Sequence, residues 1–209
     1  METTDTTSTN SRSHPYRIVL TGGPGGGKTT AADMFRREIG ERIVVVPESA
    51  TMIFTGGFPR DPSDHAVEGV QRAIYHVQRN LEDVQSKRFP DRVLLCDRGT
   101  VDGAAYWPEE DNSGFYRAME TTLEEELDRY DGVIFFESAA VGGMGIEGGN
   151  PARLESLAEA AKLDARLRKI WSNHPNFKVV HHDPSFLKKI SLGLAVMEEM
   201  IDELRHHNG

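Results

Sequence analysis

The segment Gly22-Gly23-Pro24-Gly25-Gly26-Gly27-Lys28-Thr29 constrains the fold more than any other, because it fits G-x-x-x-x-G-K-[ST] at every position. The apolar run at residues 16–21 precedes it and predicts a buried strand, while residues 27–40 predict a helix that ends near Gly40. A strand, a glycine-rich loop and a helix in this order are the context of a phosphate-binding loop. The alternative, a chance glycine-rich turn, would not explain why both flanks agree.

The residue types of this loop suit a polyphosphate. Glycines allow the backbone to wrap closely around phosphate and to turn its N–H groups inward, and the helix N-terminus adds partial positive charge. We expect Lys28 to reach the β- and γ-phosphates and Thr29 to offer its hydroxyl to Mg²⁺. The predicted nucleotide-binding residues are Gly22, Gly23, Pro24, Gly25, Gly26, Gly27, Lys28, Thr29 and Thr30.

Length and composition limit the alternatives. The chain has 209 residues, enough for one well-buried domain, which we place at 15–209 after a Thr- and Ser-rich tail, residues 1–14, predicted to be disordered. A net charge of −9 argues against a general nucleic-acid or anionic-membrane binder. One cysteine, no membrane-length apolar run and no signal peptide lead us to expect a cytoplasmic protein.

The rest of the chain alternates between strand and helix patterns. Four more strands are predicted at residues 43–46, 92–96, 132–136 and 177–180, and helices at about 65–88, 115–130, 152–171 and from about 185 onward. Apolar stripes mark two of these helices: Val70, Ile74, Val77, Leu81 and Val84, and Leu187, Ile190, Leu194, Met197, Ile201 and Leu204. The pattern predicts an α/β fold, a doubly wound five-stranded parallel sheet between two helical layers.

Ligands of such sheets bind outside the carboxyl ends of the strands, which selects the residues that follow each apolar run. We expect Asp97 to be the carboxylate that completes a Mg²⁺ site with Thr29, although it could instead cap the next turn. Arg98 could bind a phosphate or a substrate oxygen, or form a structural ion pair. Glu48 could accept a proton from a substrate hydroxyl or hold that hydroxyl, or simply favour a helix N-terminus.

Two further regions are candidates for the site. The glycine-rich loop 141–150 is a candidate mobile lid, and Arg153 at its edge could neutralise a transferring phosphate. Arg166 and Arg168 are weaker candidates for that role, and an ordinary helix-surface arginine is the alternative for all three. Tyr106 and Trp107 could stack on an acceptor ring, but core packing is the more common role of aromatic residues at helical spacing.

Three functional classes fit a phosphate-binding loop: a small-molecule kinase, a GTPase-type switch and an ATPase motor. A switch usually carries N-K-x-D after a strand, and only a weak echo exists at residues 161–164, inside a helix pattern. Motors usually place a Glu after the strand-end Asp to activate water, whereas Arg98 follows Asp97 here. The kinase interpretation is therefore favoured.

Four stretches in this order carry a family resemblance: TGGPGGGKTT, VPESATMIFTGGFP, LLCDRGTVDGAAYW and GNPARLESLAEAAKLD. Together they resemble the small AAA-type, NadR-like family of ATP/GTP-binding P-loop domains, over about residues 15–205. The resemblance implies the fold of nucleoside and nucleotide kinases. It also implies that Asp97 and Arg98 form the D-R motif of those kinases, that Glu48 is the acid after strand two, and that Arg153 is the lid-side arginine.

We therefore expect a Mg²⁺-dependent protein that binds ATP or GTP and transfers phosphate to a nucleoside-like or other small hydroxyl acceptor. The expected catalytic residues are Lys28, Asp97, Glu48 and Arg153, with Glu48 and Arg98 on the substrate and Thr29 and Asp97 on the metal. The alternative is a nucleotide-binding regulatory protein or weak NTPase switch without a small-molecule acceptor.

Overall fold

The five strands of the protein form one fully parallel sheet. In the computed structural model, which describes residues 15–109, 111–142 and 157–206, the strand order is β2-β3-β1-β4-β5. Each predicted apolar run forms one strand. The first, β1, lies between β3 and β4, with Val19 opposite both Cys96 and Val133. The strands are β1 (Arg17–Thr21), β2 (Ile43–Val46), β3 (Val93–Asp97), β4 (Gly132–Phe136) and β5 (Phe177–Val180).

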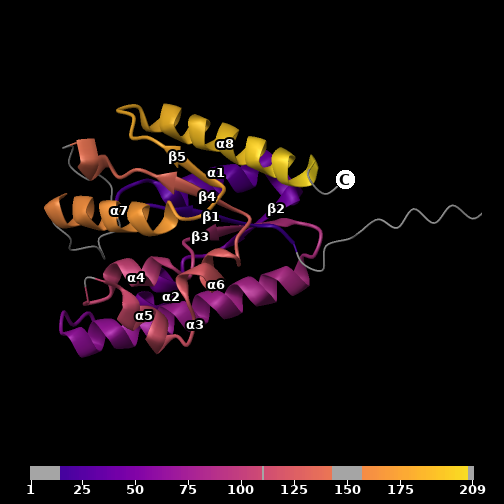
Figure 1. Ribbon diagram of the computed structural model, residues 1–209. Coiled ribbons are helices and arrows are strands. Elements are labelled where there is room, and N and C mark those ends of the chain that lie inside the picture. Colours follow the sequence, from indigo (N-terminus) through magenta and orange to yellow (C-terminus); the bar gives the residue numbers. More distant parts are fainter. Residues whose placement is uncertain (1–14, 110, 143–156, 207–209) are drawn as a thin grey trace, which may run out of the picture.

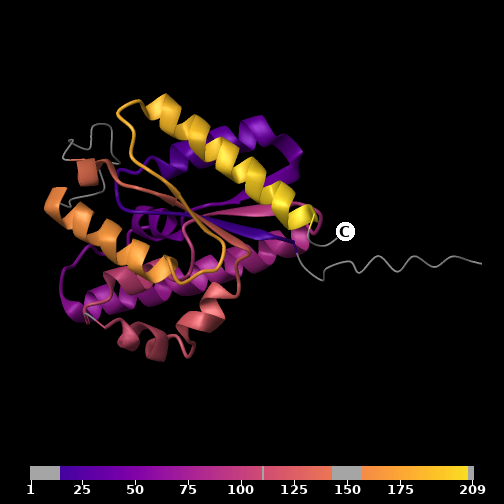
Figure 2. The same cartoon turned by 45° about the horizontal axis from the view of Figure 1, so that its top comes forward.

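Helices cover both faces of this sheet, as Figures 1 and 2 show. One face packs against α1 and α8 through a core that includes Phe35, Ile190 and Met197. The other face packs against α3 to α7 through a core that includes Phe115, Leu167 and Trp171. The helices are α1 (Lys28–Ile39), α2 (Ser49–Thr55), α3 (Asp64–Arg88), α4 (Asp102–Tyr106), α5 (Ser113–Ala118), α6 (Leu123–Leu127), α7 (Leu157–Trp171) and α8 (Phe186–His206), with short 3₁₀ turns η1 (Gly40–Arg42) and η2 (Ala139–Gly142).

The predicted α/β fold with a doubly wound five-stranded parallel sheet is confirmed. Alternate residues of the central strands point to opposite faces, so that Val19 joins one core while Ile18 and Leu20 join the other. The predicted tail, residues 1–14, lies outside the described residues. None of the described helices combines the length and the apolar character needed to cross a bilayer.

The single helix predicted over 115–130 is wrong. The chain forms α5 and α6 instead, and between them Glu120 takes a left-handed backbone conformation with φ of 54°. The hydroxyl of Thr122 then accepts the Glu125 N–H, and the Glu125 carboxylate accepts the Thr122 N–H. This reciprocal capping box begins a new helix and explains the break.

The apolar stripes are only partly core. In α8, Ile190, Met197 and Ile201 are buried, but Leu187 is 69% exposed. In α3, Val70 is buried and Val84 is 52% exposed. The remaining buried side chains of α3 are mostly polar: Gln71, Tyr75, Gln78, Glu82 and Ser86.

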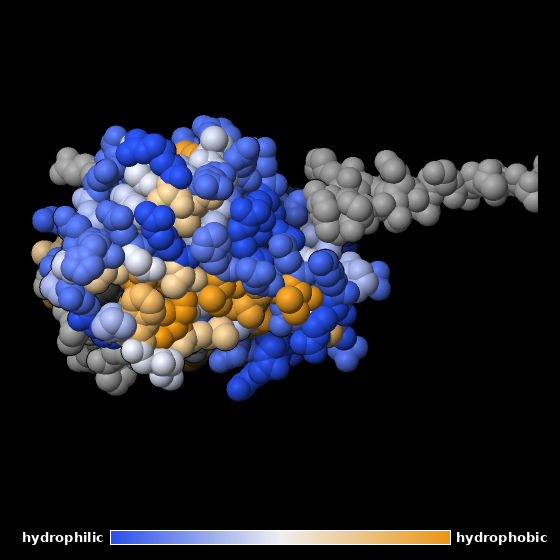
Figure 3. Space-filling view, turned by 90° about the horizontal axis from the view of Figure 1, so that it is seen from below, coloured by the Kyte–Doolittle hydropathy of each residue, from blue (hydrophilic) through white to orange (hydrophobic). Residues whose placement is uncertain are grey.

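This arrangement turns a polar face of α3 toward the sheet and leaves part of its apolar stripe at the surface. Figure 3, which looks onto the side of the molecule where α3 lies, shows the resulting band of apolar side chains. The polar face has a use, since Gln71 and Gln78 line a cavity beside the sheet.

Gly193 of α8 is tightly packed, whereas Gly69 of α3 is not. A Cβ on Gly193 would overlap the ring of Phe136, whereas a Cβ on Gly69 in α3 would meet no atom within 4 Å. We predict that Gly193→Ala lowers the free energy of unfolding by about 1–3 kcal/mol through overpacking. Gly69→Ala, the matched control, should raise it by about 0.5–1 kcal/mol because alanine restricts the unfolded chain. Urea unfolding measures both, and an unchanged Gly193→Ala midpoint would contradict the packing.

Candidate functional site

The glycine-rich loop passes directly over the backbone end of β4. Gly22, Gly25 and Gly27 have φ values of 130°, 73° and 84°, which side chains with a Cβ rarely adopt. A Cβ on Gly22 would overlap the carbonyl oxygen of Phe136, and one on Gly26 would lie 2.9 Å from it. The loop is therefore restricted to glycine by both backbone conformation and space.

Two side chains of the motif face the inside of this loop. Lys28 is buried, and its ammonium donates hydrogen bonds to the carbonyl oxygens of Gly22 and Gly23 at 2.7 and 2.8 Å. The hydroxyl of Thr29 donates to Oδ2 of Asp97 at 2.9 Å. The predicted pair of Thr29 and Asp97 is therefore brought together at the carboxyl ends of β1 and β3.

Asp97 is almost fully buried, and its second carboxylate oxygen, Oδ1, has no hydrogen-bond partner among the described residues. Burial raises the pKa of this carboxyl above its usual value, and the nearby Glu48 raises it further. An acidic oxygen without a partner beside a threonine hydroxyl is a donor set that suits Mg²⁺. No group of three or more His, Cys, Asp or Glu residues in the described part of the chain could hold a metal, so phosphate oxygens would have to complete the site.

Arg98, the next residue, holds two acids together. Its Nε donates to Glu48 and its Nη1 to Asp102 at 2.8 Å, with all three side chains largely buried. Its backbone has a φ of 73°, unusual for an arginine, and its carbonyl accepts a hydrogen bond from Gln78 at 3.1 Å. Such a locally unfavourable conformation persists only where the surroundings enforce it, which is common at functional sites.

Asp102 holds Arg98 in place through a set of buried hydrogen bonds. Its carboxylate accepts hydrogen bonds from Arg98, from the hydroxyl of Thr21 and from the indole N–H of Trp171. Three donors from β1, α7 and the turn after β3 therefore converge on one buried acid. Asp102 is not among the site residues predicted from the sequence.

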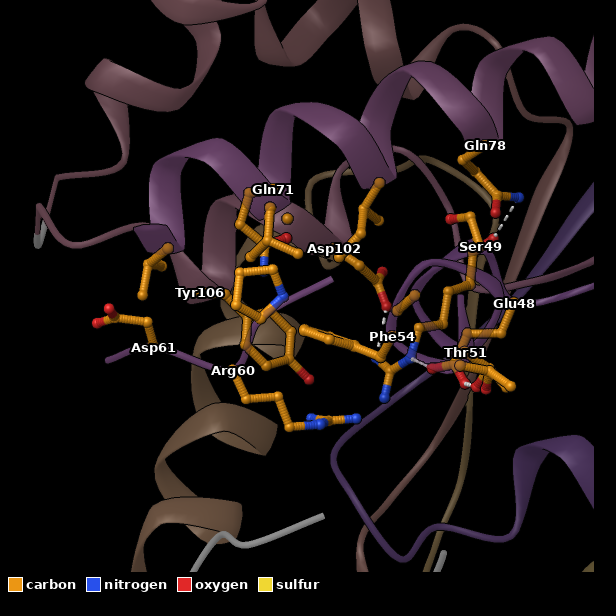
Figure 4. Close-up of a pocket in the computed structure, with 18 of the residues that line it drawn as sticks. Glu48, Ser49, Thr51, Phe54, Arg60, Asp61, Gln71, Gln78, Asp102 and Tyr106 are labelled. Carbon is orange, nitrogen blue, oxygen red and sulfur yellow. Dashed lines mark hydrogen bonds and ion pairs between the residues drawn. The ribbon is translucent and has the colours of Figure 1, made fainter. Parts of the chain in front are cut away.

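A cavity of about 730 Å³ opens beside Arg98, between α2, α3 and α4. Figure 4 shows Glu48 and Thr51 together on one side of it, with Phe54, Arg60, Gln71 and Tyr106 among the residues around it. This volume is typical of sites for small molecules. The wall also includes aliphatic and proline side chains: Ala50, Pro59, Pro62, Val67, Val70 and Ile74.

Gln71 gives this cavity a specific polar group. Its side chain is buried, lines the cavity and makes no hydrogen bond with any other residue that the structure describes. An amide offers one acceptor and two donors in a plane. A planar ligand with a complementary edge would satisfy it.

The predicted arginines of the lid region lie elsewhere or outside the described residues. Arg153 and most of the loop 141–150 fall in the range that the structure leaves undescribed. Arg166 donates to the carbonyl of Trp107 and to Asn112, and Arg168 pairs with Glu137 at 3.2 Å. The role of Arg153 therefore stays a prediction.

Three side chains that the sequence analysis missed hold the glycine loop from its outer side. The Asp164 carboxylate accepts the N–H of Gly23 at 2.8 Å, and the Ser138 hydroxyl donates to the carbonyl of Pro24. Lys189 donates to the carbonyl of Gly26 at 2.8 Å. Apolar stripes and local motifs do not reveal such contacts, because each partner lies on a distant element.

Two comparisons with known proteins found matches, one to a family and one to a fold. A family model described as AAA domain matches residues 17–185. The structure titled deoxyadenosine kinase from M. mycoides with bound dATP is similar in fold, with a TM-score of 0.62 at 16% identity, covering 87% of this chain and 99% of that one. No curated protein sequence matches the chain. Altogether 345 chains of solved structures match this chain, and a fold this common does not by itself define a substrate.

The buried ion pair of Arg98 and Asp102 generates a stability prediction. Asp102→Ala leaves the guanidinium and two other buried donors without their acceptor, so we expect the free energy of unfolding to fall by about 3–5 kcal/mol. The control is Glu68→Ala, which breaks the exposed pair with Arg72, also four residues apart, and should cost less than about 0.5 kcal/mol. Similar losses in both variants, measured by chemical denaturation, would contradict this view of the cluster.

Proposed function

The chain belongs to the AAA domain family, and we propose that it is a Mg²⁺-dependent nucleotide-binding phosphotransferase that acts on a nucleoside-like or other small hydroxyl acceptor. One observation carries this proposal. Asp97 contacts Thr29 of the glycine loop, while the adjacent Arg98 lines the cavity. A triphosphate in the loop would therefore lie beside Asp97, and an acceptor in the cavity would lie beside the next residue, Arg98.

The loop would supply the nucleotide site, for ATP or GTP. Backbone N–H groups, the start of α1 and Lys28 would bind the phosphates. Thr29 and Asp97 would hold Mg²⁺, which supplies charge neutralisation to the transferring phosphate when bound. Lys28 would leave the carbonyls of Gly22 and Gly23 to contact phosphate oxygens instead.

Glu48 would act on the acceptor. Glu48 lines the cavity, and its carboxylate is fixed by Arg98 on one oxygen and by the hydroxyl of Thr51 on the other. A carboxylate held there could accept the proton of an acceptor hydroxyl as the phosphate arrives. Arg98 would keep Glu48 oriented, and it would offer positive charge near the transferred group.

The remaining walls of the cavity suit a ring. Tyr106 and Phe54 offer aromatic surfaces, and Gln71 offers the planar donor and acceptor pair that a heterocycle edge requires. The structurally similar deoxyadenosine kinase supports a nucleoside-like acceptor, since its fold covers most of this chain.

The proposal is tested by incubating the protein with Mg²⁺ and ATP or GTP labelled at the γ-phosphate, together with a panel of nucleosides. Label transferred to an acceptor supports the phosphotransferase. Slow release of free phosphate without labelled acceptor, together with different affinities for di- and triphosphate, would favour the regulatory NTPase instead.

The acceptor side is examined with Glu48→Gln. Loss of the general base should reduce the rate of transfer by about 100-fold to 10,000-fold, while the dissociation constant for nucleotide stays within about threefold. Lys28→Ala is the contrasting variant, because it should weaken nucleotide binding itself with the fold intact by circular dichroism. Equal transfer rates for Glu48→Gln and the wild type would remove Glu48 from the mechanism.

The metal site is examined with Asp97→Asn. We expect the Mg²⁺ concentration for half-maximal activity to rise by at least about tenfold, because a neutral amide replaces an anionic ligand. Binding of nucleotide in the presence of EDTA should change much less. If both measurements change to the same extent, Asp97 has no specific role toward the metal.

A further inference from the structure

A lysine outside the phosphate-loop motif reaches the outer side of the loop. Lys189 of α8 is only 3% exposed, and its ammonium donates to the carbonyl of Gly26 at 2.8 Å and to the carbonyl of Glu137 at 2.6 Å. It therefore ties the loop to the residue after β4. Buried lysines are rare and expensive, so this placement calls for an explanation.

The planarity of the peptide bond gives these contacts a consequence. In a trans peptide the C=O and the following N–H point in opposite directions. Lys189 holds the carbonyl of Gly26 on the outside, so the N–H of Gly27 points the other way, toward the inside of the loop. Ser138 holds the carbonyl of Pro24 in the same manner, which turns the N–H of Gly25 inward.

The inner side of the loop shows the complementary pattern. Lys28 lies inside the loop, and its ammonium donates to the carbonyls of Gly22 and Gly23. The N–H of Gly23 accordingly points outward, where Asp164 accepts it. Lys28 thus holds two carbonyls of the loop on the inside, while Lys189 holds a third on the outside.

We propose that Lys189 is a positioning residue of the phosphate loop: its ammonium holds the Gly26 carbonyl outward, directs the Gly27 N–H toward bound phosphate and adds positive charge behind the loop. Ser138 does the same for the Gly25 N–H without the charge. This inference rests on the nucleotide-binding part of the proposed function and is independent of any acceptor.

The charge of Lys189 makes nucleotide affinity depend on pH. Burial lowers the pKa of Lys189 to about 8, although the carboxylates that face it, Asp164 of α7 and Glu137 after β4, oppose this shift. A bound polyphosphate would raise that pKa, because it favours the charged amine. Binding is thus strongest where free Lys189 is protonated, below pH 8, and weakens as the pH rises through 8.

The test measures the dissociation constant of Mg²⁺-ATP and Mg²⁺-GTP by calorimetry at pH 7 and pH 9, without any acceptor. For the nucleotide that binds, the wild type should lose about threefold to tenfold in affinity between the two pH values. Lys189→Met should bind about tenfold more weakly at pH 7 and show a flat profile. The control, Lys188→Met, removes the neighbouring exposed lysine that pairs with Asp183 and should behave as the wild type.

The proposal is overturned if Lys189→Met binds as tightly as Lys188→Met at pH 7, or if its affinity falls with pH in parallel with the wild type. If Lys189→Met proves too unstable to assay, the wild-type profile and Ser138→Ala decide. Ser138→Ala should weaken binding about threefold to tenfold and keep the wild-type pH dependence; unchanged affinity in Ser138→Ala, or a flat wild-type profile, overturns the proposal. Intact nucleotide binding without transfer would instead count against the acceptor chemistry alone.

Discussion

Gly22 and Gly26 lie against the carbonyl oxygen of Phe136, at the point where β4 ends beside β1. No side chain fits in that contact, so the loop approaches the sheet with backbone alone. The position of β4 next to β1 therefore determines where the loop lies, where α1 begins and where Lys28 and Thr29 emerge. The rest of the site is arranged around this one close approach of two backbones.

The second constraint is electrostatic. Glu48 follows β2, Asp97 ends β3 and Asp102 begins α4, and Arg98 bonds to the first and last of these acids. Asp97 retains an oxygen without a partner among the described residues. The polar face of α3 extends this arrangement, because Gln78 supports the Arg98 backbone while Gln71 leaves its amide to the cavity. The buried polar side chains of α3 thus support and line the site, and the same orientation of the helix leaves part of its apolar stripe at the surface.

The sheet and the loop could be predicted because their signals are local. Five apolar runs became five strands; the glycine motif follows the first of them and Asp97 ends the third, where it contacts Thr29. The break between α5 and α6 was missed, although Thr122 and Glu125 carry the spacing of a capping box. Asp164 and Lys189 could not be found in this way, because their hydrogen bonds to the loop span 141 and 163 residues. Only the packing of α7 and α8 brings them there.

The central position of β1 has a consequence for how the protein forms as it is synthesised. The glycine loop leaves the ribosome before the strands on both sides of β1, and before the helices that carry Asp164 and Lys189. A nascent chain therefore exposes an apolar strand without neighbours and a loop without support. Formation of the phosphate pocket must await α7 and α8, so molecules that lack these helices remain unable to gain stability from nucleotide.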